Sequence, residues 1–100
     1  GFTEAGQMNA VARERGLALA SGTYGESALG SLASLCHAGT LADPMAPAEQ
    51  SFFLIFADSI LLEPVAMREG RVRLPDEPID ALVDWDRVAR DARQRRAAVL

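Results

Sequence analysis

The positions of apolar residues along the chain predict three helices. In the first, Thr3 is the expected N-cap and Gly16 the expected stop, with apolar residues three and four positions apart between them. The second helix is expected to begin after Ser27 and to end at Gly39. The third is expected to begin after Asp84, and it has an apolar face and an arginine-rich face.

Short apolar runs between and after these helices predict strands. Residues 17–21 and 52–56 do not alternate with polar residues, which is typical of parallel strands that are covered on both faces. Residues 65–67 and 71–74 flank Arg68-Glu69-Gly70, a sequence that favours a hairpin turn. The first half therefore follows the order of a parallel α/β protein. A sheet of two parallel strands cannot hide both of its faces, and an α/β barrel needs roughly 250 residues. We therefore expect these two strands to belong to a larger fold.

Composition excludes several classes of protein. The 100 residues, 49% of them apolar, are enough for one small domain. A net charge of −4 disfavours a nucleic-acid partner, and no apolar run approaches the roughly 20 residues that span a membrane. All ten basic residues are arginines, so the chain alone cannot perform lysine chemistry. A single cysteine excludes an intrachain disulfide and a thiolate metal cluster, which fits a cytoplasmic location.

Few residues offer chemistry at a useful spacing. Cys36 and His37 are neighbours on the second predicted helix, so their side chains point apart, and a structural role is favoured over a catalytic pair. Asp76, Glu77 and Asp80 lie among prolines, where a solvated loop is favoured over a cation site. The arginines of the last helix are interpreted as a solvated face rather than as an anion site.

Two glutamates stand apart because of their positions. Glu26 lies in the loop between the first predicted strand and the second helix, and Glu49 lies just before the second predicted strand. In an α/β barrel, groups at the carboxyl ends of strands point into the active site, where a carboxylate can act as an acid or a hydrogen-bond donor. The alternative for Glu26 is a charge stabilised by the N-terminus of the following helix, and spacing alone favours this alternative.

Several stretches of the chain match one known family in order and with few gaps. They are Gly16-Leu17, Gly22-Thr23-Tyr24-Gly25-Glu26-Ser27-Ala28-Leu29-Gly30-Ser31-Leu32-Ala33-Ser34, Glu49, Phe52-Phe53-Leu54-Ile55-Phe56, Asp58-Ser59-Ile60-Leu61-Leu62-Glu63-Pro64, Gly70-Arg71-Val72-Arg73-Leu74-Pro75 and Val83-Asp84-Trp85-Asp86-Arg87-Val88. In these stretches the chain resembles the C-terminal segment of muconate cycloisomerases, a subgroup of the enolase superfamily. One departure is Pro78-Ile79-Asp80, where the family has a longer Pro-Gly-Leu-Gly loop, and it puts the substrate class in doubt.

The resemblance implies a fold and a division of the chain. Residues 1–57 would be the last β/α units of a modified (β/α) barrel, here incomplete. Residues 58–100 would be a hairpin and a helix that return to the capping domain. The divalent cation of the family, Mn²⁺ or Mg²⁺, and its catalytic lysines belong to strands outside these units. The chain would then bind no metal and have no activity alone.

The resemblance also implies site residues. Glu49 matches the family's glutamate at the end of the last barrel strand, which hydrogen-bonds the substrate carboxylate. Thr23, Tyr24, Gly25 and Glu26 match the loop that lines the substrate pocket. The expected partners are the rest of the parent enzyme, or a second copy of the chain, together with a small carboxylate substrate in the parent. The alternative is a stand-alone α/β interaction module without catalysis.

Overall fold

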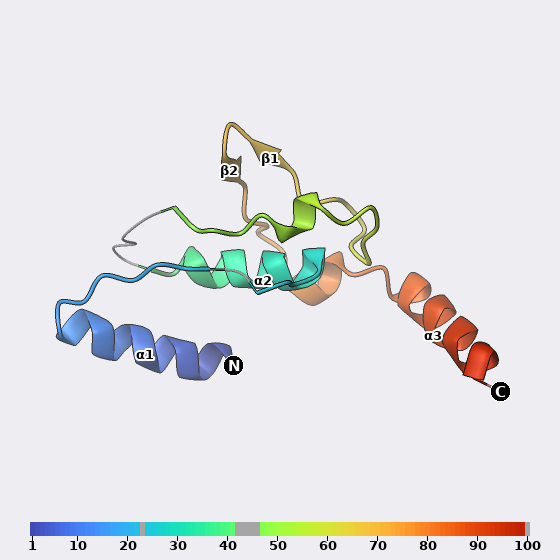
Figure 1. Ribbon diagram of the computed structural model, residues 1–100, viewed down its shortest axis with the longest axis horizontal. Coiled ribbons are helices and arrows are strands. Elements are labelled where there is room, and N and C mark those ends of the chain that lie inside the picture. Colours follow the sequence, from blue (N-terminus) through green and yellow to red (C-terminus); the bar gives the residue numbers. More distant parts are fainter. Residues whose placement is uncertain (23, 42–46, 100) are drawn as a thin grey trace.

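The chain combines three α-helices with short extended segments (Figure 1). The computed structural model describes residues 1–22, 24–41 and 47–99. Within these residues, the elements are the helices α1 (Phe2–Glu14), α2 (Ala28–Ala38) and α3 (Trp85–Val99), the 3₁₀ turns η1 (Phe52–Leu54) and η2 (Ile79–Leu82), and the strands β1 (Met67–Arg68) and β2 (Arg71–Val72). The expected mixture of helices and strands is therefore confirmed.

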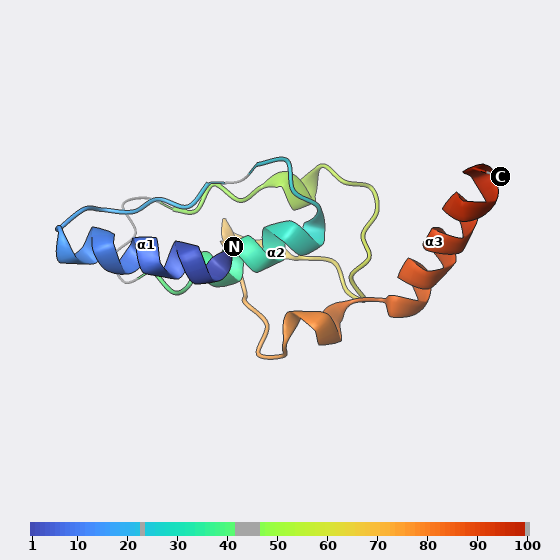
Figure 2. The same ribbon diagram turned by 90° about the horizontal axis from the view of Figure 1, so that it is seen from below.

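Two extended segments, residues 17–22 and 47–50, run side by side in the same direction. They are joined by a parallel bridge between Gly22 and Glu49, and the Glu49 amide donates to the Ser21 carbonyl at 2.9 Å. Both views show the two segments together, with α1 and α2 running in the opposite direction (Figures 1 and 2). Helix and extended segment thus alternate in the predicted order. The segment at residues 17–22 is joined by isolated bridges, however, and does not form the regular strand predicted at 17–21.

The strand predicted at residues 52–56 is wrong. Phe52–Leu54 forms η1, whose local hydrogen bonds run from the Leu54 amide to Ser51 and from the Ile55 amide to Phe52. Phe53 is buried, whereas the next three side chains are exposed. A continuous apolar run does not distinguish a buried strand from a turn with one buried anchor, because both lack alternation. The extended segment lies instead just before the run, at residues 47–50.

Helix starts follow the capping residues at two of three positions. The Ser27 hydroxyl accepts from the Gly30 amide at 3.3 Å, and an Asp84 carboxylate oxygen accepts from the Arg87 amide at 2.8 Å. Both bonds satisfy amides that have no partner within the helix, so both predicted caps are confirmed. Thr3 is not a cap, because α1 already includes it.

The predicted hairpin is confirmed in its position, but Arg68 belongs to β1 rather than to the turn, and the strands are shorter than the predicted 65–67 and 71–74. Strands β1 and β2 pair antiparallel, with Met67 opposite Val72. The two residues between the strands, Glu69 and Gly70, have φ values of 50° and 73°. Positive φ at both positions is the geometry of a type I′ turn, which matches the twist of the flanking strands.

One apolar cluster joins the two predicted parts of the chain. The segment after the hairpin returns to pair with residues 60–62 through an antiparallel bridge between Leu61 and Val83. Leu61 also belongs to the buried core, together with Ala28 and Leu32 of α2 and Phe53 of η1. The core therefore contains residues from both sides of position 57, and the division at that position stays a prediction.

The described chain is open and extended. Its radius of gyration is 16.1 Å, whereas about 13 Å is usual for a compact domain of this length. It exposes 7864 Å², whereas a compact protein of this mass exposes about 5,500 Å². Helix α3 points away from the rest of the molecule (Figures 1 and 2). No helix of the described residues is long and apolar enough to cross a membrane, and a cytoplasmic location stays a prediction.

Candidate functional site

The parallel pairing brings the predicted site residues to one end of the first half. Tyr24, Gly25 and Glu26 follow the first extended segment, and Glu49 lies at the end of the second, opposite Gly22. Two parallel segments present their carboxyl ends at the same edge, so these residues share that edge. Thr23 lies outside the described residues.

The Glu26 side chain is held against the first turns of α2. It is half-buried, and its carboxylate accepts a hydrogen bond from the Ser34 hydroxyl at 2.9 Å. Gly30 leaves room for it, because a Cβ at that position would lie 3.0 Å from the Glu26 Cβ. The carboxylate thus bonds a side chain within α2, and stabilisation of Glu26 by the helix N-terminus stays a prediction. Gly30 and Ser34, which support this side chain, are two residues to which sequence reasoning gave no separate role.

The remaining residues of the loop are open to solvent. Tyr24 is 95% exposed, and Gly25 has a φ of +59°, a conformation that glycine adopts at little cost. Glu49 is exposed as well. An exposed tyrosine and an exposed glutamate at one edge can contact a ligand, but they do not by themselves enclose it.

Gln50 is the buried polar residue of this edge, and sequence reasoning did not single it out. Only 6% of its surface is exposed. Its side-chain nitrogen donates to the Gly22 carbonyl at 2.9 Å and to the Ser21 hydroxyl at 3.2 Å. Because the Gly22 carbonyl can only accept, the amide nitrogen rather than the amide oxygen must face it. A glutamine next to an apolar run carries no sequence signal of such a bridge.

A charge cluster joins the beginning of α3 to residues 58–59, in the loop before β1. The Arg87 guanidinium donates to an Asp58 carboxylate oxygen and, at 2.7 Å, to the Ser59 carbonyl. The hydrogen bond from Arg87 lowers the pKa of Asp58, and it raises the pKa of Arg87 in return. The cluster joins α3 to the loop before β1 and contains none of the predicted site residues.

The neighbouring pair Cys36 and His37 forms no catalytic arrangement with partners in the described chain. The His37 ring lies 3.3 Å from the Asn9 side-chain nitrogen and packs against the Phe2 ring, with centroids 5.5 Å apart. Burial raises the pKa of the Cys36 thiol, which makes it a weaker nucleophile at neutral pH. His37 therefore packs between α2 and α1, and Cys36 packs against the buried core.

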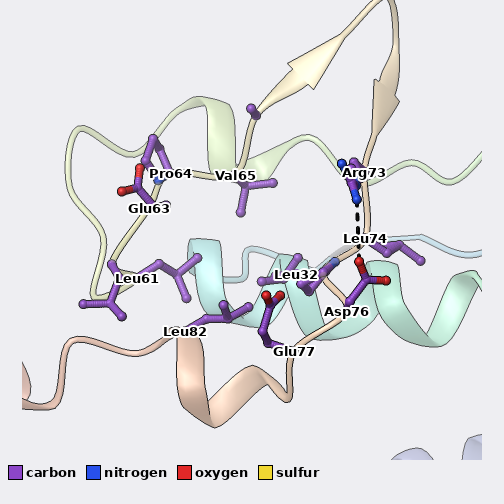
Figure 3. A pocket seen from close by; sticks show the side chains of 13 residues that line it. Leu32, Leu61, Glu63, Pro64, Val65, Arg73, Leu74, Asp76, Glu77 and Leu82 are labelled. Carbon is purple, nitrogen blue, oxygen red and sulfur yellow. Dashed lines mark ion pairs between the residues drawn. The ribbon is translucent and has the colours of Figure 1, made fainter.

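An apolar cavity lies elsewhere, between α2 and the returning segment, residues 61–82 (Figure 3). It has a volume of about 480 Å³ and is lined mainly by leucines, prolines and valine, with three acidic residues, Glu63, Asp76 and Glu77. Asp76 pairs with Arg73 at 3.5 Å, and both side chains are highly exposed. None of the predicted site residues that the structure describes lines this cavity.

Metal binding has no support in the described residues, where no three histidine, cysteine or acidic side chains converge. The acids near the predicted site also do not fit a hard cation, because Glu26 already takes a hydroxyl hydrogen bond and faces α2. Comparison with protein-family models, curated proteins and solved structures gave no match to this chain.

Proposed function

We propose that this chain is a C-terminal segment of a muconate-cycloisomerase-like enzyme. The parent would convert cis,cis-muconate to a lactone, or would perform a related proton abstraction next to a carboxylate. The observation that carries the proposal is the parallel pairing of Gly22 with Glu49, joined through α2. This βαβ-like arrangement is the unit from which an α/β barrel is built, and it leads Glu49 and the Tyr24–Glu26 loop to one edge.

In this proposal the residues of that edge have separate roles. Through its carboxylic acid proton, Glu49 donates a hydrogen bond to the substrate carboxylate as negative charge develops there, and this bond strengthens in the transition state. Tyr24, Gly25 and Glu26 line the pocket and orient the substrate. The family resemblance implies that the cation of the parent, Mn²⁺ or Mg²⁺, would bind residues outside this chain.

The large exposed surface also supports the proposal. The described chain exposes about 2,400 Å² more than a compact protein of its mass. Exposed apolar side chains include Leu17 on the first extended segment and Ile55 after η1. Barrel units that have lost their neighbours expose such a surface, because each extended segment has an unpaired edge and each helix an uncovered side.

A stand-alone interaction module is the second candidate. The apolar cavity of about 480 Å³ between α2 and the returning segment favours it, because such a cavity can hold a side chain of a partner. In that case the chain binds a partner through this cavity and catalyses nothing, and the resemblance to the enzyme is only ancestral.

Turnover of cis,cis-muconate separates the two candidates. The test uses the complete protein that the gene encodes, with Mn²⁺, and follows loss of substrate absorbance and formation of lactone. We expect turnover by a protein of about 370 residues, a two-domain length. The same residues 1–100 expressed alone should show none. A gene that encodes only these residues, or a complete protein without any such isomerase activity, would contradict the proposal.

A further inference from the structure

We infer that Gln50 is a positioning residue that fixes Glu49 against the Tyr24–Glu26 loop. This inference rests on the proposed function, and it adds a residue that neither the sequence pattern nor the family resemblance assigns. The Gln50 nitrogen donates to two consecutive residues of the opposite segment, Ser21 and Gly22. Glu49 precedes Gln50 directly, and its own amide donates to the Ser21 carbonyl.

These bonds form a small network across the two segments. The backbone bridge at Glu49 and the Gln50 side chain both bind residues 21–22, just before the loop that carries Glu26. The side-chain bonds add to the backbone bridge, in which the Glu49 amide donates to the Ser21 carbonyl at 2.9 Å. The added bonds restrict how far the two segments can slide and twist, and a displacement of about 1 Å at a reacting group can cost on the order of 100-fold in rate.

Burying an amide at this position costs more free energy than burying an apolar side chain of similar size. The Gln50 oxygen has no partner among the described residues, although the side chain is almost fully buried. A methionine would fill a similar volume without burying an unpaired acceptor. The stabilisation that glutamine provides here therefore lies in the two bonds that its nitrogen donates.

The test compares Gln50→Met with wild type in the complete protein, and uses Gln7→Met as the matched control. Gln7 is exposed on α1, so the same change there removes no bridge between segments. Activities are divided by the folded fraction, because a merely structural role would lower that fraction and leave the activity of each folded molecule unchanged. We expect Gln50→Met to lower kcat by about tenfold per folded molecule, because Glu49 acts in the transition state.

A second variant and a second measurement keep the test decisive. If Gln50→Met does not fold, Ser21→Ala replaces it, because this change removes one of the two acceptors of the Gln50 nitrogen and leaves the glutamine in place. Hydrogen exchange at the Glu49 amide, followed by mass spectrometry, should be faster in either variant than in the Gln7→Met control. Normal kcat per folded molecule together with unchanged exchange would overturn the inference.

The same measurements distinguish this failure from a failure of the proposed function. If the wild-type protein does not convert muconate, the proposed function fails and the exchange experiment decides the role of Gln50 alone. Faster exchange at Glu49 then supports a bridge between the segments, and unchanged exchange refutes it.

Discussion

Residues 1–100, expressed alone, should not behave as a well-packed monomer. The structure exposes 7864 Å², which is about 2,400 Å² more than a compact protein of 10.7 kDa exposes. A standard interface buries about 800 Å² on each partner, so the excess equals roughly three such surfaces. An excess of this size drives association, since large apolar patches are rare on soluble monomers.

The exposed turn after η1 is one place to perturb this association. Leu54, Ile55 and Phe56 are consecutive, and Ile55 is 71% exposed. A charge at Ile55 opposes burial of this run in an interface, while the cost in the monomer is small because the side chain is already in water. We expect Ile55→Asp to weaken association by about tenfold, a change of about 1.4 kcal/mol. Gln94→Asp, on the exposed part of α3, is the matched control and should have little effect.

Sedimentation velocity over a range of micromolar concentrations measures this prediction. The wild-type chain should sediment above the mass of a monomer, and the average mass should rise with concentration. A sharp monomer near 10.7 kDa with a cooperative thermal transition would refute the reasoning. That result would favour a stand-alone interaction module over a segment of a larger enzyme.

Three further predictions concern the complete protein. Glu49→Gln should lower kcat by about 100-fold, whereas Glu26→Gln should mainly raise KM. Steady-state kinetics measures both, and a lowered kcat for Glu26→Gln with a raised KM for Glu49→Gln would mean that the two roles are reversed. The ion pair of Asp58 lowers its pKa from the usual 3.8, so its stabilisation is present above that value and is lost as the pH falls through the lowered pKa. Thermal melting between about pH 2 and 6 should therefore show a weaker acid dependence for Asp58→Asn, and an unchanged profile would contradict this. Gly70→Ala should lower the free energy of unfolding by about 1 kcal/mol, because the φ of Gly70 is +73°. Gly6→Ala should raise it by roughly 0.5–1 kcal/mol, because Gly6 lies in helix α1 with open space around it. Urea unfolding measures both changes.

Features that depend on neighbouring residues were predictable from the sequence. The caps at Ser27 and Asp84 form because a side-chain oxygen reaches an amide three residues away, whatever the rest of the chain does. The hairpin forms because Glu69 and Gly70 adopt the positive φ values of a type I′ turn. In both cases the controlling interaction is local, so the sequence pattern contains it.

Features that depend on distant packing were not predictable. The run at residues 52–56 has the composition of a buried strand, yet only Phe53 is buried, because α2 and Leu61 provide one contact surface rather than two. Gln50 shows the same limit for a polar residue. Its role depends on the Gly22 carbonyl, which is 28 residues away in the sequence and is brought close only by the parallel pairing.

The two glutamates of the candidate site are consequently placed by different interactions. Glu26 is held by α2, through the Ser34 hydroxyl and the space at Gly30. The backbone of Glu49 is held by the opposite segment, through its bridge to Gly22 and the neighbouring amide of Gln50. A change on α2 can therefore move the Glu26 carboxylate without moving Glu49, and a change at Gln50 acts first on Glu49. Such independence fits one carboxylate that lines a pocket and another that acts in the transition state, because binding and catalysis can then vary separately.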